Sequence, residues 1–234
     1  MNNIAIMQPT FLPWIGYFAM IDRVEDFVFL DSVQFSKRSW QQRNQIFSLN
    51  GPIWLTVPII SKGKSDQLIK DTKIDNSREW ARKVHNSLTS SYSNTKFFKK
   101  YRGPIFESIN QNIENISDLN INLIKVIMDQ LGMNGTKFYR SSELSSEGSK
   151  AELLSNICVE LGKNEYLSAP GSKEYISESR DFEQRSIEVK YHDYKHPEYD
   201  QGKKEFRSHL SIVDLLFNEG DKALEILRSG VVYE

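Results

Sequence analysis

The pattern that most constrains the fold lies at the N-terminus, where two short apolar runs flank a proline-containing loop and a helical pattern. Residues 4–7 (IAIM) and 26–31 (DFVFLD) have the composition of buried strands, and residues 14–24 (WIGYFAMIDRV) predict a helix between them. A crossover of this length joins parallel strands, so the pattern predicts a Rossmann-like βαβ unit. The loop after the first strand then lies at the carboxyl edge of the sheet, where open α/β sheets usually carry their sites.

The rest of the chain extends this pattern. Asn50-Gly51 predicts the turn of a hairpin with strands at 43–49 and 52–59, and three helices are expected at 77–92, 94–113 and 117–133. Further strands are expected at 136–140, 165–169 and 185–194, alternating with helices at 148–162 and 171–179 before a last helix at 211–220. Ser77, Ser117 and Ser211 are expected to cap helices, and Gly132 to end one.

We therefore predict an α/β fold with a mostly parallel or mixed sheet flanked by helices. The chain is expected to form a single domain over residues 1–234. Its predicted parts are an N-terminal α/β part at 1–75, a helical part at 76–134 and a C-terminal α/β part at 135–234.

Composition excludes several classes of function. Thirty basic and thirty-one acidic residues leave a net charge of -1, so no overall field favours DNA, and an anionic ligand must meet a local patch. No segment has the roughly 18 apolar residues of a membrane span, and the N-terminus lacks a signal-peptide pattern, so a cytoplasmic location is expected. The single cysteine, Cys158, lies on the apolar face of a helical pattern and is expected to be a core thiol.

The candidate binding residues follow the first strand. Proline, glycine and aromatic residues at this point predict a rigid loop that brings backbone amides to a ligand, with cationic side chains nearby for phosphate. The alternative is that the aromatic residues belong to the core and the cations to a solvated face. The substrate-binding candidates are Gln8, Pro9, Trp14, Gly16, Tyr17, Gln34, Lys37, Arg38, Trp40, Arg43 and Asn44.

Three residues are candidates for proton transfer: Asp31, His85 and His196. Asp31 ends an apolar strand, His85 shares a helix face with Trp80, and His196 follows the strand predicted at 185–194. The segment 192–198 (HDYKHPE) also suggests metal binding, but its spacing fixes no third strong ligand. No metal site is therefore predicted.

Several motifs resemble those of the WbqC-like protein family. They are Gln-Pro at 8–9, Pro-Trp-Ile-Gly-Tyr-Phe at 13–18, Asp-Ser-Val-Gln-Phe at 31–35, Arg-Asn at 43–44 and Trp-Leu-Thr-Val-Pro at 54–58. The C-terminal segments 166–176, 196–201 and 210–220 are similar to the family as well, so the resemblance spans most of the chain. One departure is Met7, where the family pattern commonly has histidine before Gln-Pro.

The resemblance implies an enzyme of bacterial surface-polysaccharide (O-antigen, lipopolysaccharide) biosynthesis, with glycine transfer proposed for some members. Its small-molecule substrate would be an amino sugar or nucleotide sugar. An activated glycyl donor would supply the acyl group, or ATP would activate glycine. Such a reaction needs a base for the amine and donors for a tetrahedral oxyanion. The alternatives are an ATP-using nucleotidyltransferase-like enzyme or ligase, and a non-catalytic nucleotide-sugar-binding protein. The loop lacks the paired histidines of nucleotidyltransferases, and no phosphate-loop motif occurs.

Overall fold

The computed structural model describes residues 2–64 and 66–232, and it confirms the predicted α/β class. Five parallel strands form the central sheet in the order β5-β2-β1-β6-β7. The strands are β1 (Asn3–Met7), β2 (Asp26–Phe29), β5 (Lys137–Arg140), β6 (Glu165–Ser168) and β7 (Glu188–Tyr191). From β1 the chain adds two strands on one side and then returns to add two on the other. The direction of winding therefore reverses between β1 and β6.

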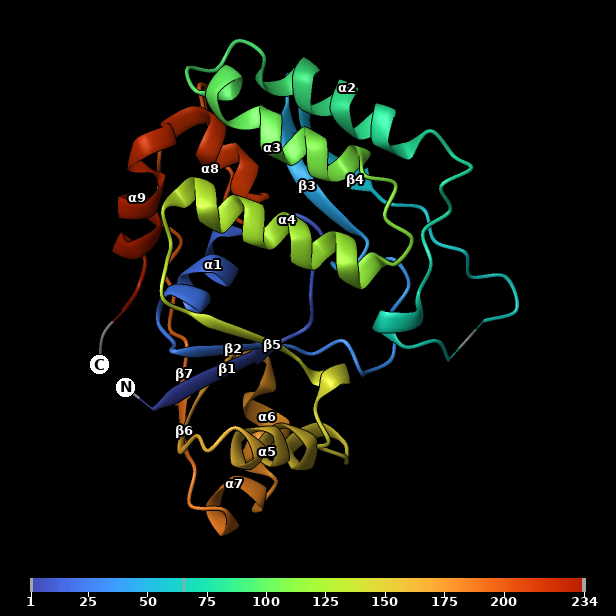
Figure 1. Ribbon diagram of the computed structural model, residues 1–234. Helices are drawn as coiled ribbons and strands as arrows, with labels where there is room; N and C mark the ends of the chain where they lie inside the picture. The colour runs from blue at the N-terminus through green and yellow to red at the C-terminus, as the bar shows by residue number, and fades with distance from the viewer. Residues whose placement is uncertain (1, 65, 233–234) are drawn as a thin grey trace.

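Helices cover both faces of the sheet (Figure 1). One face carries α5 (Lys150–Glu160), α6 (Lys173–Ser177) and α7 (Asp181–Gln184), and the other carries α1 (Ile15–Asp22) with α4 (Ile116–Leu131) above it. Alternate residues of the strands serve the two layers: Phe27 and Phe29 enter the core beneath α1, whereas Val28 packs with α5. Burial on both faces explains why the inner strands β1 and β2 are largely apolar runs.

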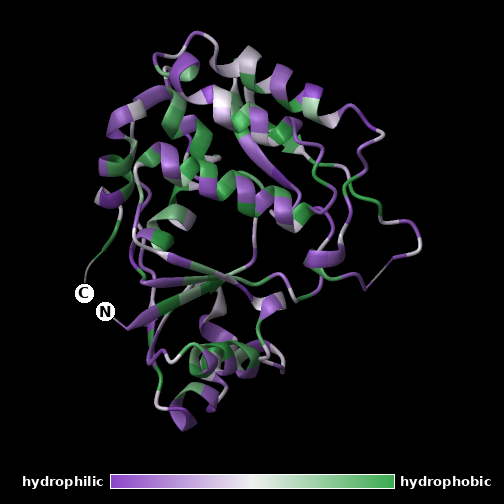
Figure 2. Ribbon diagram, in the orientation of Figure 1, coloured by the Kyte–Doolittle hydropathy of each residue, from purple (hydrophilic) through white to green (hydrophobic). Residues whose placement is uncertain are grey.

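The predicted hairpin and helical region are confirmed. β3 (Arg43–Ser48) and β4 (Gly51–Thr56) pair antiparallel around Asn50-Gly51. The remaining α-helices lie on the same side of the sheet as α4, with α9 beside α1 and with the outermost helix, α2, mostly hydrophilic in Figure 2. They are α2 (Trp80–Tyr92), α3 (Phe98–Asn110), α8 (Ile212–Glu219) and α9 (Ala223–Ser229). Short 3-10 turns occur at η1 (Ile69–Asp71), η2 (Ser141–Glu143), η3 (Pro170–Ser172) and η4 (Gly220–Lys222).

Local predictions differ in accuracy. Gly132 ends α4 in the left-handed conformation, Ser211 caps α8 through the amide of Val213, and Cys158 is buried, which raises the pKa of its thiol to about 12. The caps predicted at Ser77 and Ser117 are wrong, because α2 begins after Glu79 and α4 after Asn115. The short α7 and the last helix, α9, were not predicted. Within the described ranges, no helix has the length and apolar character needed to cross a membrane.

Candidate active site

A two-lobed cleft opens at the carboxyl edge of the sheet, at the point where the winding reverses. The lobes have volumes of about 410 Å³ and 310 Å³ and share Met7, Thr10 and Trp40. The larger lobe lies over the ends of β1 and β6, where ligands of doubly wound sheets usually bind. Its further lining residues are Ile6, Gln8, Leu30, Ser39, Gln41, Leu154, Tyr166, Ala169, Gly171, Ser172 and Tyr175. The smaller lobe is further lined by Pro13, Trp14, Tyr17, Asn44 and His209.

The loop at residues 8–13 forms the floor of this cleft, and buried amides hold it. Asn120 Nδ2 donates to the carbonyls of Pro9 at 3.0 Å and Gln41 at 2.8 Å, and Asn44 Nδ2 donates to the carbonyls of Leu12 at 2.7 Å and Phe11 at 3.3 Å. The hydroxyl of the buried Tyr17 donates to the carbonyl of Gln8. Since these carbonyls accept bonds from the protein, the loop is fixed before any ligand arrives.

Trp14 explains the glycine two residues later. A Cβ placed on Gly16 would lie 2.2 Å from the Trp14 ring, so only glycine lets the indole fold back over the first turn of α1. The indole is thereby held as a wall of the smaller lobe. In the Pro-Trp-x-Gly motif, the glycine therefore leaves the space that the tryptophan ring needs to line the cleft.

His209 stands against this wall. Its ring stacks on Trp14 with 4.9 Å between ring centroids, and its backbone has a φ of 60°, which is uncommon for a residue with a side chain. The following residues are tied to the floor and the hairpin: the Ile212 amide donates to the Pro13 carbonyl, and the Ser211 amide to that of Gln45. His209 is exposed, and its Nδ1 lies 2.8 Å from Ser208 Oγ. When Nδ1–H donates to Ser208, the Nε2 lone pair remains available.

A half-buried group of rings packs against His209. His196 lies 5.2 Å from His209 and 6.1 Å from Trp14, measured between ring centroids, and also contacts Tyr199. Burial lowers the pKa of His196, which favours its neutral form. Tyr199 in turn donates to the buried carboxylate of Asp214, which also accepts a bond from Tyr92. Burial raises the pKa of Asp214 to about 6.

The lining of the cleft is neutral apart from His209. Neither lobe is lined by a lysine, arginine, aspartate or glutamate among the described residues. Aromatic rings, amides and hydroxyls dominate, a combination that suits stacking on the face of a neutral ring and hydrogen bonding at its edge. Thr10 faces both lobes, and neither its hydroxyl nor its amide has a partner in the described part of the chain. The cleft can thus supply one base and a free pair of donors.

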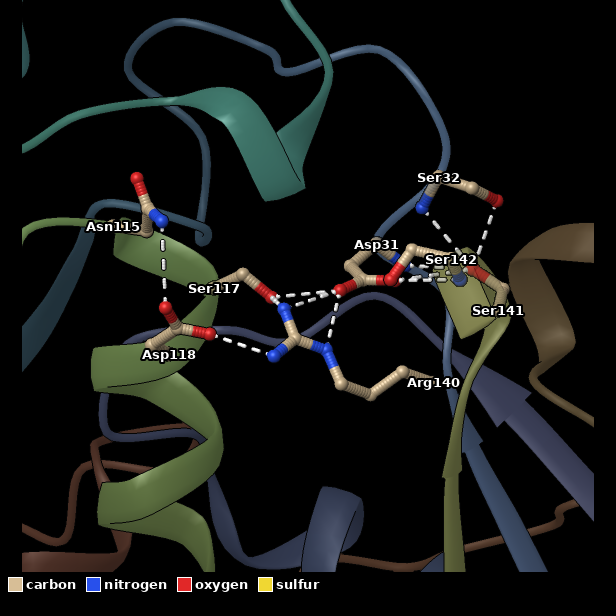
Figure 3. Close-up of polar contacts among 8 residues, drawn as sticks. All are labelled: Asp31, Ser32, Asn115, Ser117, Asp118, Arg140, Ser141 and Ser142. Carbon is tan, nitrogen blue, oxygen red and sulfur yellow. Dashed lines mark hydrogen bonds and ion pairs between the residues drawn. The ribbon is translucent and has the colours of Figure 1, made fainter. Parts of the chain in front are cut away.

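Asp31 occupies a different place, although it lies at the same edge of the sheet. Its carboxylate is fully buried and pairs with Arg140 at 2.7 Å, while the Ser142 amide donates to it at 3.1 Å (Figure 3). Ser117 and Ser141 add hydroxyl donors. The Arg140 guanidinium also bonds Asp118 at 2.7 Å, so it joins β5, the end of β2 and the start of α4. A base role for Asp31 remains a prediction, and this saturated geometry favours a positioning role.

The other predicted residues are dispersed. Gln8, Trp14, Tyr17, Trp40 and Asn44 line the cleft, and Pro9 and Gly16 shape its floor. Lys37, Arg38 and Gln34 are exposed and line neither lobe. Arg43 lies over the Trp54 ring at 4.2 Å. His85 also lines neither lobe, because it stacks on Phe106 between α2 and α3.

The histidine-rich segment at 192–198 forms no metal centre in the described residues. His192 Nδ1 lies 3.0 Å from Arg23 Nη1, and its Nε2 lies 3.2 Å from the Gly16 carbonyl. The two ring nitrogens thus connect the residue after β7 to both ends of α1. Burial lowers the pKa of His192 to about 4, so the ring is neutral at physiological pH.

Sequence reasoning missed several residues of the cleft. They are Thr10, Gln41, Gly171, Ser172, Tyr175 and His209. One feature of the sequence could have pointed to His209: it lies two residues before Ser211, the predicted cap of the last helix. The loop after β6 gave a second signal, since it follows a parallel strand at the carboxyl edge.

The strand order defines a doubly wound α/β protein, and its cleft lies at the switch point of the parallel sheet. The model of the WbqC-like protein family matches residues 8–226, and the chain belongs to this family. A curated relative, the uncharacterized protein Rv1507c of Mycobacterium tuberculosis (strain ATCC 25618 / H37Rv), is 35% identical over 232 residues, covering 97% of this chain and 98% of the relative. No solved structure matches the chain.

Proposed function

We propose that the chain is a transferase of surface-polysaccharide biosynthesis that acylates the amine of an amino sugar, free or nucleotide-linked, with glycine as the acyl group. The observation that carries this proposal is the neutral, aromatic-walled cleft with a single histidine, His209, at its edge. A sugar ring offers an apolar face for Trp14 or Trp40 and hydroxyls for the amides and hydroxyls around it. The polysaccharide context and the glycyl group come from the family resemblance.

The proposed reaction assigns each group a role. The sugar amine attacks the glycyl carbonyl carbon, a C–N bond forms, and the bond to the leaving oxygen of the donor breaks. His209 Nε2 accepts the amine proton, and the Thr10 amide and hydroxyl donate to the developing oxyanion. Asn44, predicted as a donor to substrate, instead positions the floor, because Nδ2 already serves two carbonyls. Met7 lines both lobes, so the position where the family pattern has histidine also faces the cleft.

One observation favours a second function, an ATP-using nucleotidyltransferase-like enzyme. The strand order is that of a doubly wound, mononucleotide-binding sheet. The lining argues against it, because no lysine or arginine of the described residues lines either lobe to balance a triphosphate.

Mass spectrometry tests the proposal directly. The purified protein is incubated with UDP- or dTDP-linked amino sugars, with glycine and ATP or with glycyl-tRNA as donor. We expect the acceptor to gain one glycyl residue. No gain with any acceptor and donor would contradict acyl transfer. Release of pyrophosphate from ATP without glycyl transfer would support the nucleotidyltransferase alternative, and binding without any turnover would indicate a non-catalytic protein.

A further inference from the structure

Two exposed tryptophans continue the cleft onto the hairpin. Trp40, which lines both lobes, is 51% exposed, and its ring lies 5.4 Å from that of Trp54, which is 43% exposed. The register of β3 and β4 pairs Gln45 with Trp54 and Arg43 with Thr56, so Arg43 and Trp54 share the outer face of the hairpin. We call Trp40, Trp54 and Arg43 the tryptophan pad. Large exposed aromatic surfaces of this kind mark sites of interaction.

The pad and the turn that carries Trp40 both contain cations. The Arg43 guanidinium carbon lies 4.2 Å from the Trp54 ring centroid, and its Nε is buried without a partner in the described residues. Lys37 and Arg38 are exposed on the turn that carries Trp40. That turn is held in shape, because the Arg38 amide donates to Gln42 Oε1 at 3.0 Å and Arg38 adopts a φ of 59°. Aromatic rings beside fixed cations suit a ligand with a flat ring and phosphates.

The position of these cations outside the cleft is important, because the cleft itself has none among the described residues. A nucleotide sugar carries a diphosphate between its sugar and its base, and no lysine or arginine in the described part of the chain lines either lobe. A diphosphate attached to a sugar in the cleft would therefore need cations outside the two lobes, and Lys37 and Arg38 are exposed on the turn that carries Trp40. The pad is continuous with the cleft through Trp40.

We infer that the tryptophan pad binds the base of a nucleoside diphosphate and that Lys37 and Arg38 bind its phosphates, while the attached sugar enters the cleft. This inference rests on the proposed function and narrows its substrate to a nucleotide-linked amino sugar. The base stacks on Trp40 and Trp54, and the Arg43 guanidinium, which lies over the Trp54 ring, adds a positive charge to the pad. Binding of the nucleotide would thus orient the sugar amine toward His209.

Calorimetry with nucleoside diphosphates alone tests this inference. UDP, dTDP, GDP and CDP are titrated into the full chain without sugar or acyl donor. We expect at least one to bind, with Trp54→Ala weakening binding about tenfold, as loss of one stacking partner does. Val159→Ala, a truncation of another exposed apolar residue, is the matched control and should bind like wild type. Equal melting temperatures would show that both variants fold, since both side chains are exposed.

A second pair of variants tests the phosphate contacts. Lys37→Gln/Arg38→Gln should weaken binding about threefold to tenfold and flatten its dependence on salt, whereas Lys62→Gln/Lys64→Gln, in another exposed segment, should change neither. Binding of no diphosphate, or unchanged binding by Trp54→Ala, would overturn the inference. Tighter binding of a CCA RNA trinucleotide than of every diphosphate would also overturn it and make the pad a site for an RNA end.

The outcome separates this inference from the proposed function. Diphosphate binding lost in Trp54→Ala, together with absence of glycyl transfer, would retain the nucleotide site and reject only the reaction. Glycyl transfer to a free amino sugar, without diphosphate binding, would retain the reaction and reject the nucleotide site.

Discussion

Two polar regions lie side by side at the carboxyl edge of the sheet, and they differ in how far their groups satisfy one another. The network at the ends of β2 and β5 contains Asp31, Asp118 and Arg140, and its charges are paired within hydrogen-bonding distance (Figure 3). The cleft at the ends of β1 and β6 is lined by one histidine and by neutral groups, and Thr10 keeps donors without a partner among the described residues.

Whether a polar group is already paired distinguishes a structural role from a functional role better than the type of residue does. A buried carboxylate with donors from four residues around it has no lone pair left for a substrate, so its role is to hold elements together. A fixed wall with free donors can accept a ligand without first breaking its own bonds. On this basis we expect the network to matter for stability and the cleft for activity.

The largest expected effect is on activity. His209→Gln removes the proposed base and should lower the rate of glycyl transfer about a thousandfold, which corresponds to about 4 kcal/mol. The melting temperature should change little, because the side chain is exposed. Rates are measured by mass spectrometry of the acceptor. His85→Gln is the matched control, and a comparable loss in that variant would instead support the base predicted at His85.

The network should show the opposite behaviour. Arg140→Leu leaves the Asp31 carboxylate buried without its cation and should lower the free energy of unfolding by about 3 kcal/mol. Chemical denaturation measures this change. Arg82→Leu, which removes an exposed ion pair with Glu79, should remain close to wild type. Adding Asp31→Asn to Arg140→Leu should recover part of the loss, and equal effects of both arginine variants would refute the structural role.

Asp214 contrasts with Asp31, because it is a buried carboxylate without an ion pair in the described structure. Its pKa of about 6 lies above the ordinary 3.8, so ionisation costs stability as pH rises from about 4 to 6. Asp214→Asn should therefore raise the free energy of unfolding by about 3 kcal/mol at pH 7. The difference between variant and wild type should vanish near pH 4.

The measurement must compare the two proteins at each pH. His192, whose pKa is lowered to about 4, contributes stability that is present above pH 6.5 and is lost as pH falls toward 4, which is the opposite slope. Denaturation curves of both proteins at several pH values cancel the His192 contribution. A pH-independent difference would show that Asp214 titrates normally in the fold.

The sequence predicted the framework because the framework depends on local patterns. Continuous apolar runs identified β1 and β2, and Asn50-Gly51 identified the hairpin, since both signals lie within a few residues. Ser117 shows where such reasoning ends. Its position predicted a helix cap, but its hydroxyl donates to Asp31, eighty-six residues away in the chain. A partner far away in the chain, and not the start of the helix, determines what this side chain binds.

The cleft could be predicted only in part for the same reason. Trp14 and Tyr17 lie in the loop and helix that follow β1, so the βαβ pattern placed them near the carboxyl edge. His209 is almost two hundred residues away and reaches the cleft only because the segment before α8 hydrogen-bonds with Pro13 and Gln45. No periodicity reports such a contact. Asp31 was placed at the correct edge, but Arg140, its partner across the sheet, was not foreseen.

The smallest expected effect concerns Gly171, which tests whether the open volume of the larger lobe is itself functional. A Cβ there would meet nothing within 4 Å, and its backbone is not left-handed, so neither packing nor conformation requires glycine. Gly171→Leu should fill part of the lobe and raise the KM for the amino sugar about tenfold with little loss of stability. Gly103→Leu, at another open position, is the matched control. An unchanged KM would place the sugar outside this lobe and confine the site to the side of His209.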